Sequence, residues 1–303
     1  MRLFHSITAL VLCGIATFLQ QPACSRAATI SLPAVKDNTL LRYDPLDPNT
    51  ALNSNGIGDF FSAGRTSARD ELRRGLIQFD LSTVPANLQL VPGSVHLILR
   101  VIGIPRRDTT PRPFWVVPLS GLAGPWGEGA SDADIAVSGS GSGAPAQLGD
   151  ATWFHSSYNP SIHDQTTFTA GGPGFWNAQG ALGAAISDPA AIYGSAAGTS
   201  GSVVGVVDFT SPSMQNDVSL WLADPSKNFG WIIVGDEGVT GGADASSKRD
   251  FASRQHANPD FQPVLTFEVV AVPEPSTLVL SLMGIATALQ LGAQRCRTAN
   301  RRE

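Results

Sequence analysis

The chain has 303 residues, of which 43% are hydrophobic and only 15% are charged, and its formal net charge is −5. Between Ala28 and Val272 there are 14 lysines and arginines against 23 aspartates and glutamates, a net charge of −9. This acidic balance argues against nucleic acids and anionic lipid surfaces as partners. The few charges and the many glycines and prolines are typical of short strands joined by turns.

Residues 1–27 have the features of a secretory signal peptide. Arg2 precedes an apolar segment from Ile7 to Leu19, and small residues follow it up to Ala28. Such a segment is removed on export and takes no part in the mature fold. The three cysteines of the chain all lie outside residues 28–271: Cys13, Cys24 and Cys296. The exported body is therefore expected to fold around a buried core without a disulfide.

The body contains a series of short segments with the period of β-strands. In Arg73 to Ser82, successive side chains alternate as in a half-buried strand, and in Ser94 to Val101 the apolar side chains share one face. The predicted strands are Ala28–Leu32, Asp37–Leu41, Arg73–Ser82, Ser94–Val101, Phe114–Leu119, Val203–Phe209, Gly230–Gly235 and Pro263–Val270.

One helix is predicted after Thr210. Ser211 is suited to cap it, Pro212 to occupy its first position, and Asp224 to end it before Pro225. The side chains expected to face a sheet are Val218, Trp221 and Leu222. Many short strands and one short helix indicate an all-β fold, an antiparallel β-sandwich formed by a single domain of residues 28–271.

The body also resembles a known domain family. The stretch R-R-G-L-I-Q-F-D-L-S-T-V-P, from Arg73 to Pro85, is similar to the opening of DNRLRE-type domains. Further similar motifs are W-G-E-G (126–129), G-D-A-T-W (149–153), N-F-G-W-I-I (228–233) and F-A-S-R-Q-H-A-N-P (251–259). The resemblance implies a jelly-roll-like sandwich related to family 96 carbohydrate-binding modules. Gln255 departs from the family pattern, in which an acidic residue is common at this position.

The last segment, residues 272–303, resembles the PEP-CTERM sorting tail of Gram-negative bacteria. An apolar stretch from Leu278 to Ala293 lies between a Pro-Glu-Pro motif and a basic end. The matching residues are Pro273, Glu274, Pro275, Gly284, Arg295, Arg297, Arg301 and Arg302. The resemblance implies a transmembrane sorting helix that holds the protein at the inner membrane until an exosortase removes it. The arginines favour the cytoplasmic side, so the body would lie outside.

Motifs for catalysis are scarce. The sequence has neither a G-x-S-x-G elbow nor an H-E-x-x-H zinc motif. Glu128 and Glu237 are the candidate carboxylates for glycoside chemistry. A structural contact of Glu128 with Arg73, Arg74 or Arg254 is the preferred interpretation. His155 and His163 are expected to be exposed polar residues, so no zinc or other cofactor is predicted.

Two weaker candidate sites remain. Calcium is an alternative for Asp132 and Asp134, as it is for the acidic loop with Asp44, Asp47 and Asn49, although turn formation is the preferred role for these residues. A glycan site is predicted in the irregular stretch before Ala196, where rings would stack on sugars. Its members are Tyr158, Phe175, Trp176, Tyr193 and His163. The alternative, which is the preferred interpretation, is that these rings cover the end of the sandwich.

The sequence thus favours an exported, non-catalytic protein of the cell surface or extracellular matrix with a carbohydrate-binding-like body. Its expected partners are the secretion machinery, an exosortase, the inner membrane as a transient anchor, and an extracellular polysaccharide. Two alternatives remain open. One is a secreted polysaccharide-active enzyme, a lyase or hydrolase, and the other is a purely structural matrix protein.

Overall fold

The computed structural model describes residues 26–42, 52–66, 71–104, 110–119, 125–134, 143–163, 176, 196–200, 204–238 and 246–271. The sorting tail and nearly all of the predicted signal peptide lie outside these residues. Residues 29–86 and 90–269 form one compact unit, which is the body of the protein. A second unit comprises residues 1–28, 87–89 and 270–303, of which only 26–28, 87–89 and 270–271 are described.

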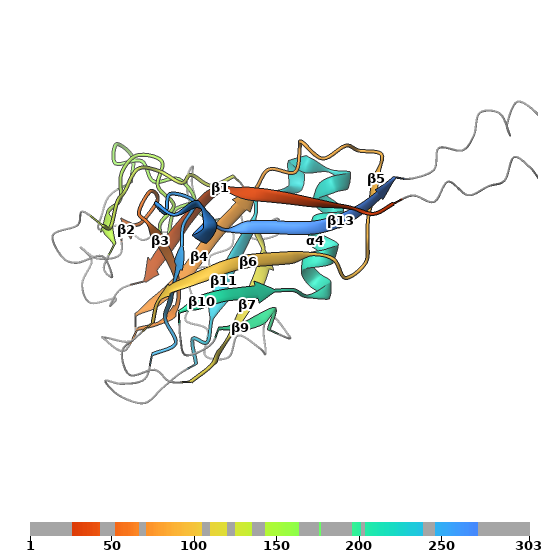
Figure 1. Ribbon diagram of the computed structural model, residues 1–303. Coiled ribbons are helices and arrows are strands. Elements are labelled where there is room, and N and C mark those ends of the chain that lie inside the picture. Colours follow the sequence, from red (N-terminus) through yellow and green to blue (C-terminus); the bar gives the residue numbers. More distant parts are fainter. Residues whose placement is uncertain are drawn as a thin grey trace, which may run out of the picture. The chain divides into compact units, whose positions relative to one another are not determined.

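The described residues form a mostly antiparallel β structure with one α-helix, which confirms the predicted fold class at this level (Figure 1). The elements are β1 (Ala28–Arg42), β2 (Asn53–Ser54), β3 (Phe60–Arg65), β4 (Leu72–Phe79), β5 (Leu88–Leu90), β6 (His96–Gly103), β7 (Arg112–Pro118), β8 (Ala144–Pro145), β9 (Gly198–Ser200), β10 (Gly205–Phe209), α4 (Pro212–Ala223), η3 (Pro225–Lys227), β11 (Trp231–Gly235), β12 (Arg249–Ala252), η4 (Pro259–Phe261) and β13 (Val264–Ala271).

Apart from the two-stranded pair of β2 and β8, the described strands form one continuous 11-stranded sheet, which divides into two layers that share β1 and β3. The β6 sheet contains β10, β6, β12 and β13, and the β4 sheet contains β4, β11, β7 and β9. β1 pairs with both β13 and β4, and β3 pairs with both β12 and β4. The two strands predicted between Ala28 and Leu41 are one strand, β1, whose pairing with β4 is interrupted by an irregularity between Ala34 and Lys36. Sharing of strands therefore joins the sheets into a sandwich-like body.

Aromatic side chains fill the space between the two sheets. Phe114 of β7 packs against Phe251 of β12 and Phe209 of β10, with ring centroids 5.4 and 6.0 Å apart. Phe61 of β3 stacks on Phe251 at 5.5 Å. All four rings are fully buried. Since one large apolar side chain removed from water contributes about 1.5–3 kcal/mol, this cluster is a major source of stability.

The β4 strand is buried on both faces, so the prediction of a half-buried strand is wrong. Ile77 pairs with Trp231 of β11 and Leu76 with Ile232, and all four side chains are fully buried. Leu76 and Ile232 belong to a cluster on the outer face of the β4 sheet that also contains Trp126, Trp153 and Trp176. The three tryptophan side chains cover the face that alternation alone assigned to solvent.

Helix α4 begins and ends where the sequence predicts. The Ser211 hydroxyl accepts the backbone N–H of Met214 at 3.2 Å, and Asp224 caps the other end. Its buried side chains are Met214, Val218 and Trp221, whereas Leu222, predicted to face the sheet, is only partly buried. Positions 214, 218 and 221 follow the helical period, so they share one stripe. Trp221 lies 4.6 Å from Trp231 of β11 between ring centroids, which anchors the helix.

Candidate functional site

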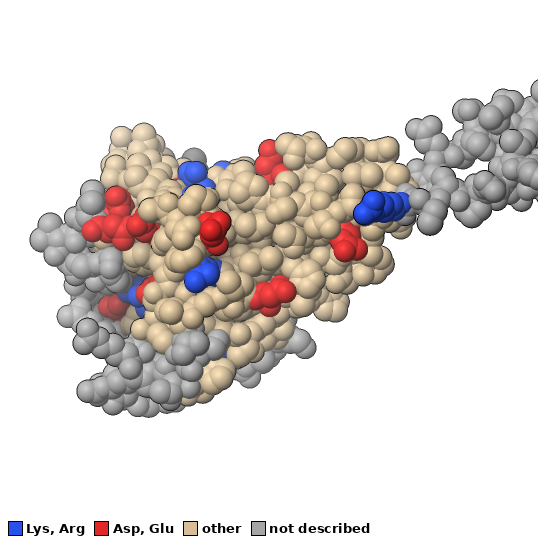
Figure 2. Space-filling model, viewed as in Figure 1, with Lys and Arg blue, Asp and Glu red and all other residues tan. Residues whose placement is uncertain are grey.

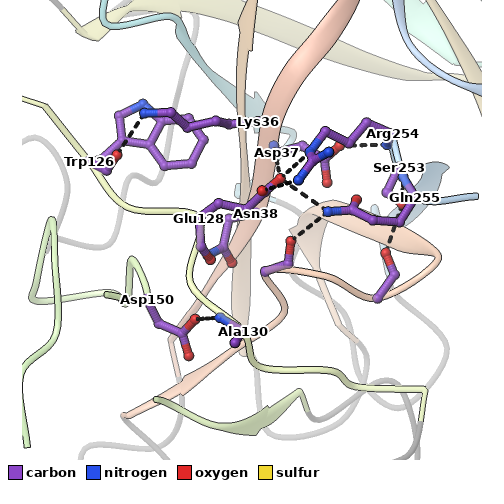
Figure 3. Close-up of polar contacts among 12 residues, drawn as sticks. Lys36, Asp37, Asn38, Trp126, Glu128, Ala130, Asp150, Ser253, Arg254 and Gln255 are labelled. Atoms are coloured by element: carbon purple, nitrogen blue, oxygen red, sulfur yellow. Dashed lines mark hydrogen bonds and ion pairs between the residues drawn. The ribbon is translucent and has the colours of Figure 1, made fainter. Parts of the chain in front are cut away.

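A group of charged and polar side chains surrounds Glu128 in the W-G-E-G loop (Figure 3). Its carboxylate accepts hydrogen bonds from the Arg254 guanidinium, with Nε at 2.6 Å and Nη2 on the second oxygen. The Gln255 amide donates to it at 3.1 Å, and the Asp37 backbone N–H donates at 3.0 Å. One carboxylate thus joins β1, the W-G-E-G loop and the loop after β12.

Backbone contacts fix the W-G-E-G loop in place. Asn38 donates its amide N–H to the Glu128 carbonyl at 2.9 Å, and Lys36 donates to the Trp126 carbonyl at 3.1 Å. Gly129 has a φ of 75°, and a Cβ there would lie 1.5 Å from the Asp150 carboxylate. Asp150 in turn accepts the Ala130 N–H at 2.8 Å. The motifs W-G-E-G and G-D-A-T-W therefore serve mutual packing, and only glycine fits position 129.

Asp37 is the most perturbed acid in this group. Its side chain is fully buried, and within the described residues its Oδ1 has no hydrogen-bond partner. The pKa of Asp37 is raised to about 8, chiefly by burial and to a lesser extent by the Glu128 charge, while the hydrogen bond from the Arg254 backbone N–H and the Arg254 charge act in the opposite direction. Asp37 therefore carries a proton at neutral pH, because the neutral form avoids a buried charge.

An acid with a raised pKa beside a second carboxyl group is the arrangement of many acid/base pairs. In this protein, however, Asp37 is 0% exposed and the Glu128 side chain is only 12% exposed. Glu128 also already accepts hydrogen bonds from three different residues. A reacting group must come within hydrogen-bond reach of its catalyst, and Asp37 offers no exposed surface for this. The contact of Glu128 with an arginine is present as predicted, and the partner is Arg254.

Glu237, the other candidate carboxylate, is also held by an arginine. Its two oxygens accept hydrogen bonds from Nε and Nη2 of Arg74 at 2.7 and 2.9 Å. Both side chains are 0% exposed. The Arg74 guanidinium lies 4.7 Å from the centre of the Trp153 ring, a cation–π distance. Glu237 therefore balances a buried charge beneath the loops on the outer face of the β4 sheet.

The protonation of Asp37 gives a testable pH dependence of stability. Its folded pKa of about 8 lies above its ordinary value of 3.8, so the folded protein holds a proton that the unfolded chain releases. The stabilising contribution is therefore complete below about pH 4 and is lost as the pH rises to about 8.

In the variant Asp37→Asn this pH-dependent contribution to stability is absent. We expect urea unfolding at about pH 5 and about pH 8 to show the variant gaining stability relative to the natural protein at the higher pH. An unchanged difference would mean that Asp37 is ionised in the fold.

The two histidines of the 151–163 loop are buried, so the prediction that they are exposed polar residues is wrong. His155 and His163 expose 1% and 6% of their surface and stack with ring centroids 4.2 Å apart. The pKa of His155 is lowered to about 4, chiefly by burial and in part by the neighbouring His163. His163 accepts the Asn159 N–H through Nδ1 at 2.9 Å. The pair thus belongs to the packing of this loop.

The predicted glycan-binding residues are described in part. Tyr158 and Trp176 expose only 4% and 3% of their surface, and Tyr158 packs beside His155 and His163. The Trp176 indole N–H donates to the Thr152 carbonyl at 2.8 Å. Phe175 and Tyr193 lie outside the described residues. The described members favour the alternative role, in which these rings cover the sandwich.

Of the calcium candidates that the structure describes, Asp132 takes part in a turn and Asp134 in a contact with a distant loop. An Asp132 oxygen accepts the Asp134 backbone N–H at 2.9 Å, and Asp134 accepts the Asp59 N–H at 2.5 Å. Asp44, Asp47 and Asn49 lie outside the described residues. In the ranges that the structure covers, no three acidic, histidine or cysteine side chains form a group suited to a metal ion. Of the helices described, none has the length and apolar character needed to span a bilayer.

Asp37 and Asp150 were not singled out by the sequence, because nothing local to either residue signals its burial. Asp37 lies in β1 and Asp150 in a loop, and their partners come from distant parts of the chain, as the contact of Asp37 with Arg254 shows.

Comparison with known proteins adds no identification, since no protein-family model and no curated protein sequence matches this chain.

Proposed function

We propose that this chain is an exported, non-catalytic protein of the bacterial cell surface or extracellular matrix, with a jelly-roll-like, carbohydrate-binding-like body. The mostly antiparallel, two-layered fold supports the body's assignment. The resemblance of residues 73–85 and of the later motifs to DNRLRE-type domains supports its class. The cysteine-free body and the features of both termini support its export.

One observation carries the non-catalytic assignment. Glu128 and Glu237, the carboxylates best placed in the sequence for glycoside chemistry, each bind an arginine through two hydrogen bonds. A general acid needs a raised pKa and access to the substrate, and a nucleophile needs an open approach. The paired arginine occupies both oxygens of each carboxylate with charge-assisted hydrogen bonds. In this proposal both glutamates stabilise the fold and neither acts as a catalytic acid or nucleophile.

The sorting proposal rests on the order of Pro273-Glu274-Pro275, the apolar stretch and the terminal arginines. We expect the protein released from the surface to lack Leu278 to Glu303, because an exosortase would cleave near Pro275. Mass spectrometry of the released protein measures its C-terminus directly. Neutral replacements of all four arginines should reduce retention at the membrane before cleavage. Recovery of an intact C-terminus from the released protein would contradict this proposal.

A further inference from the structure

A pocket of about 320 Å³ opens on the outer face of the β6 sheet, away from the buried rings discussed above. It is lined by Thr29, Val91, Pro92, Gly93, Ser94, His96, Thr266, Phe267 and Glu268. Thr266 of β13 is the cross-strand partner of His96 of β6. Because side chains alternate along a strand, Glu268 lies on the same face as Thr266, while Leu265 and Phe267 point into the core.

The turn that forms one wall of the pocket is fixed from two sides. The Ser94 hydroxyl donates to the Val91 carbonyl at 2.7 Å and accepts the Glu268 N–H at 3.0 Å. From α4, the Gln215 side chain accepts the Gly93 N–H at 3.1 Å and donates to the Val91 carbonyl at 3.3 Å. Because these hydrogen bonds already fix the wall, a ligand does not have to order it on binding. The entropic cost of binding is therefore lower.

Several polar groups of the pocket are not used by the fold. Within the described part of the chain, the hydroxyls of Thr29 and Thr266 and the carboxylate of Glu268 have no hydrogen-bond partner. His96 directs Nδ1 to both carboxylate oxygens of Asp208 at 3.0 Å, which leaves Nε2 as the ring nitrogen for a ligand. The pocket therefore offers hydroxyls, a carboxylate and an imidazole to one bound molecule.

The charge around the pocket decides between classes of ligand. Glu268 lines it and Asp208 adjoins His96, so an anionic group would be repelled there. On the side of the molecule shown in Figure 2, where β13, β6 and β10 lie nearest the reader, charged residues are scattered over a mostly uncharged surface. Val91 and Pro92 add apolar surface, against which the C–H groups of a sugar ring can pack.

We propose that this pocket binds a neutral sugar residue of a polysaccharide, through hydroxyl contacts to Glu268, Thr266, Thr29 and His96. The inference rests on the proposed carbohydrate-binding function and gives it a site other than the predicted aromatic one. A sugar hydroxyl both donates and accepts, so it complements a carboxylate on one side and a threonine hydroxyl on the other. The pocket volume lies at the lower end of the range of about 300–1,000 Å³ for ligand sites, which fits one or two sugar rings.

The test uses the purified full chain and Glu268→Gln and Thr266→Val variants. Binding of cellohexaose, xylohexaose and mannohexaose is measured by calorimetry, with an alginate hexamer as the anionic comparison. For the neutral sugar that binds, we expect Glu268→Gln to weaken affinity about tenfold and Thr266→Val by somewhat less. Matched controls are Asp260→Asn in η4 and Thr83→Val in the turn after β4, both exposed residues outside the pocket. They should bind like the natural protein, and all variants should keep its thermal midpoint.

The results of this test distinguish failure of the proposed pocket from failure of the proposed carbohydrate-binding function. Neutral sugar binding that both pocket variants leave unchanged would overturn this site and keep the carbohydrate-binding function. Preference for the alginate hexamer would overturn the neutral ligand class. If none of the four oligosaccharides binds, both the site and the carbohydrate-binding function are contradicted.

Discussion

Replacing Glu237 by alanine is expected to destabilise the protein by about 3–5 kcal/mol, because the variant leaves a buried arginine without its counter-charge. Arg74 and Glu237 are both 0% exposed and are joined by two hydrogen bonds. Water cannot replace the lost carboxylate at a site covered by Trp153. The free energy of unfolding in urea at neutral pH measures the loss directly.

The matched control for this loss is an exposed pair. Asp208 is 53% exposed and pairs with His96, which is 37% exposed, so Asp208→Ala should cost no more than about 1 kcal/mol. A double variant, Glu237→Ala with Arg74→Met, should regain part of the stability, since an apolar side chain leaves no buried charge. If Glu237→Ala behaved like Asp208→Ala, Arg74 would have access to solvent in the folded protein.

Trp176→Ala is expected to cost about 3–5 kcal/mol, the loss typical of removing a large ring from a packed core. Trp176 is 3% exposed and lies in the cluster on the outer face of the β4 sheet with Trp126 and Trp153. Its indole N–H also satisfies the Thr152 carbonyl, which the alanine variant would leave unpaired. Thermal and urea unfolding give the size of the effect.

Trp176→Phe serves as the control, since it keeps most of the apolar volume and loses only the hydrogen bond. Its cost should therefore be much smaller than that of alanine. A nearly unchanged thermal midpoint for Trp176→Ala, together with weaker glycan binding, would return Trp176 to the predicted glycan site. A large loss of stability assigns the ring to the fold.

Local signals in the sequence predicted the longer strands and helix α4, whereas the strands β3 and β12 were not predicted. The alternation of apolar and other side chains between Val95 and Val101 predicted strand β6 and its buried face. This was possible because the period of a strand can be recognised within the segment itself. Helix α4 was predicted at both ends because Ser211, Pro212 and Asp224 act on neighbouring backbone groups. The prediction of the buried side chains of α4 was correct for Val218 and Trp221, but the third buried side chain is Met214 rather than Leu222.

Contacts between distant segments could not be predicted in the same way. The Glu128 group joins residues 91 and 126 positions apart in the chain, and no local pattern fixes which arginine meets which acid. The sequence left Arg73, Arg74 and Arg254 as alternatives for Glu128, and the fold selects Arg254. The burial of His155, His163 and the second face of β4 likewise depends on where the covering loops lie.

The proposed function is that the body binds a polysaccharide without cleaving it. The direct measurement incubates the surface-released protein with neutral polysaccharides and determines both the bound fraction, by co-sedimentation, and the release of reducing ends or unsaturated products. We expect a bound fraction and no product, because the candidate carboxylates are held by arginines and the pocket on the β6 sheet is open. Release of product would show an enzyme, and the absence of binding to every polysaccharide would leave a purely structural matrix protein.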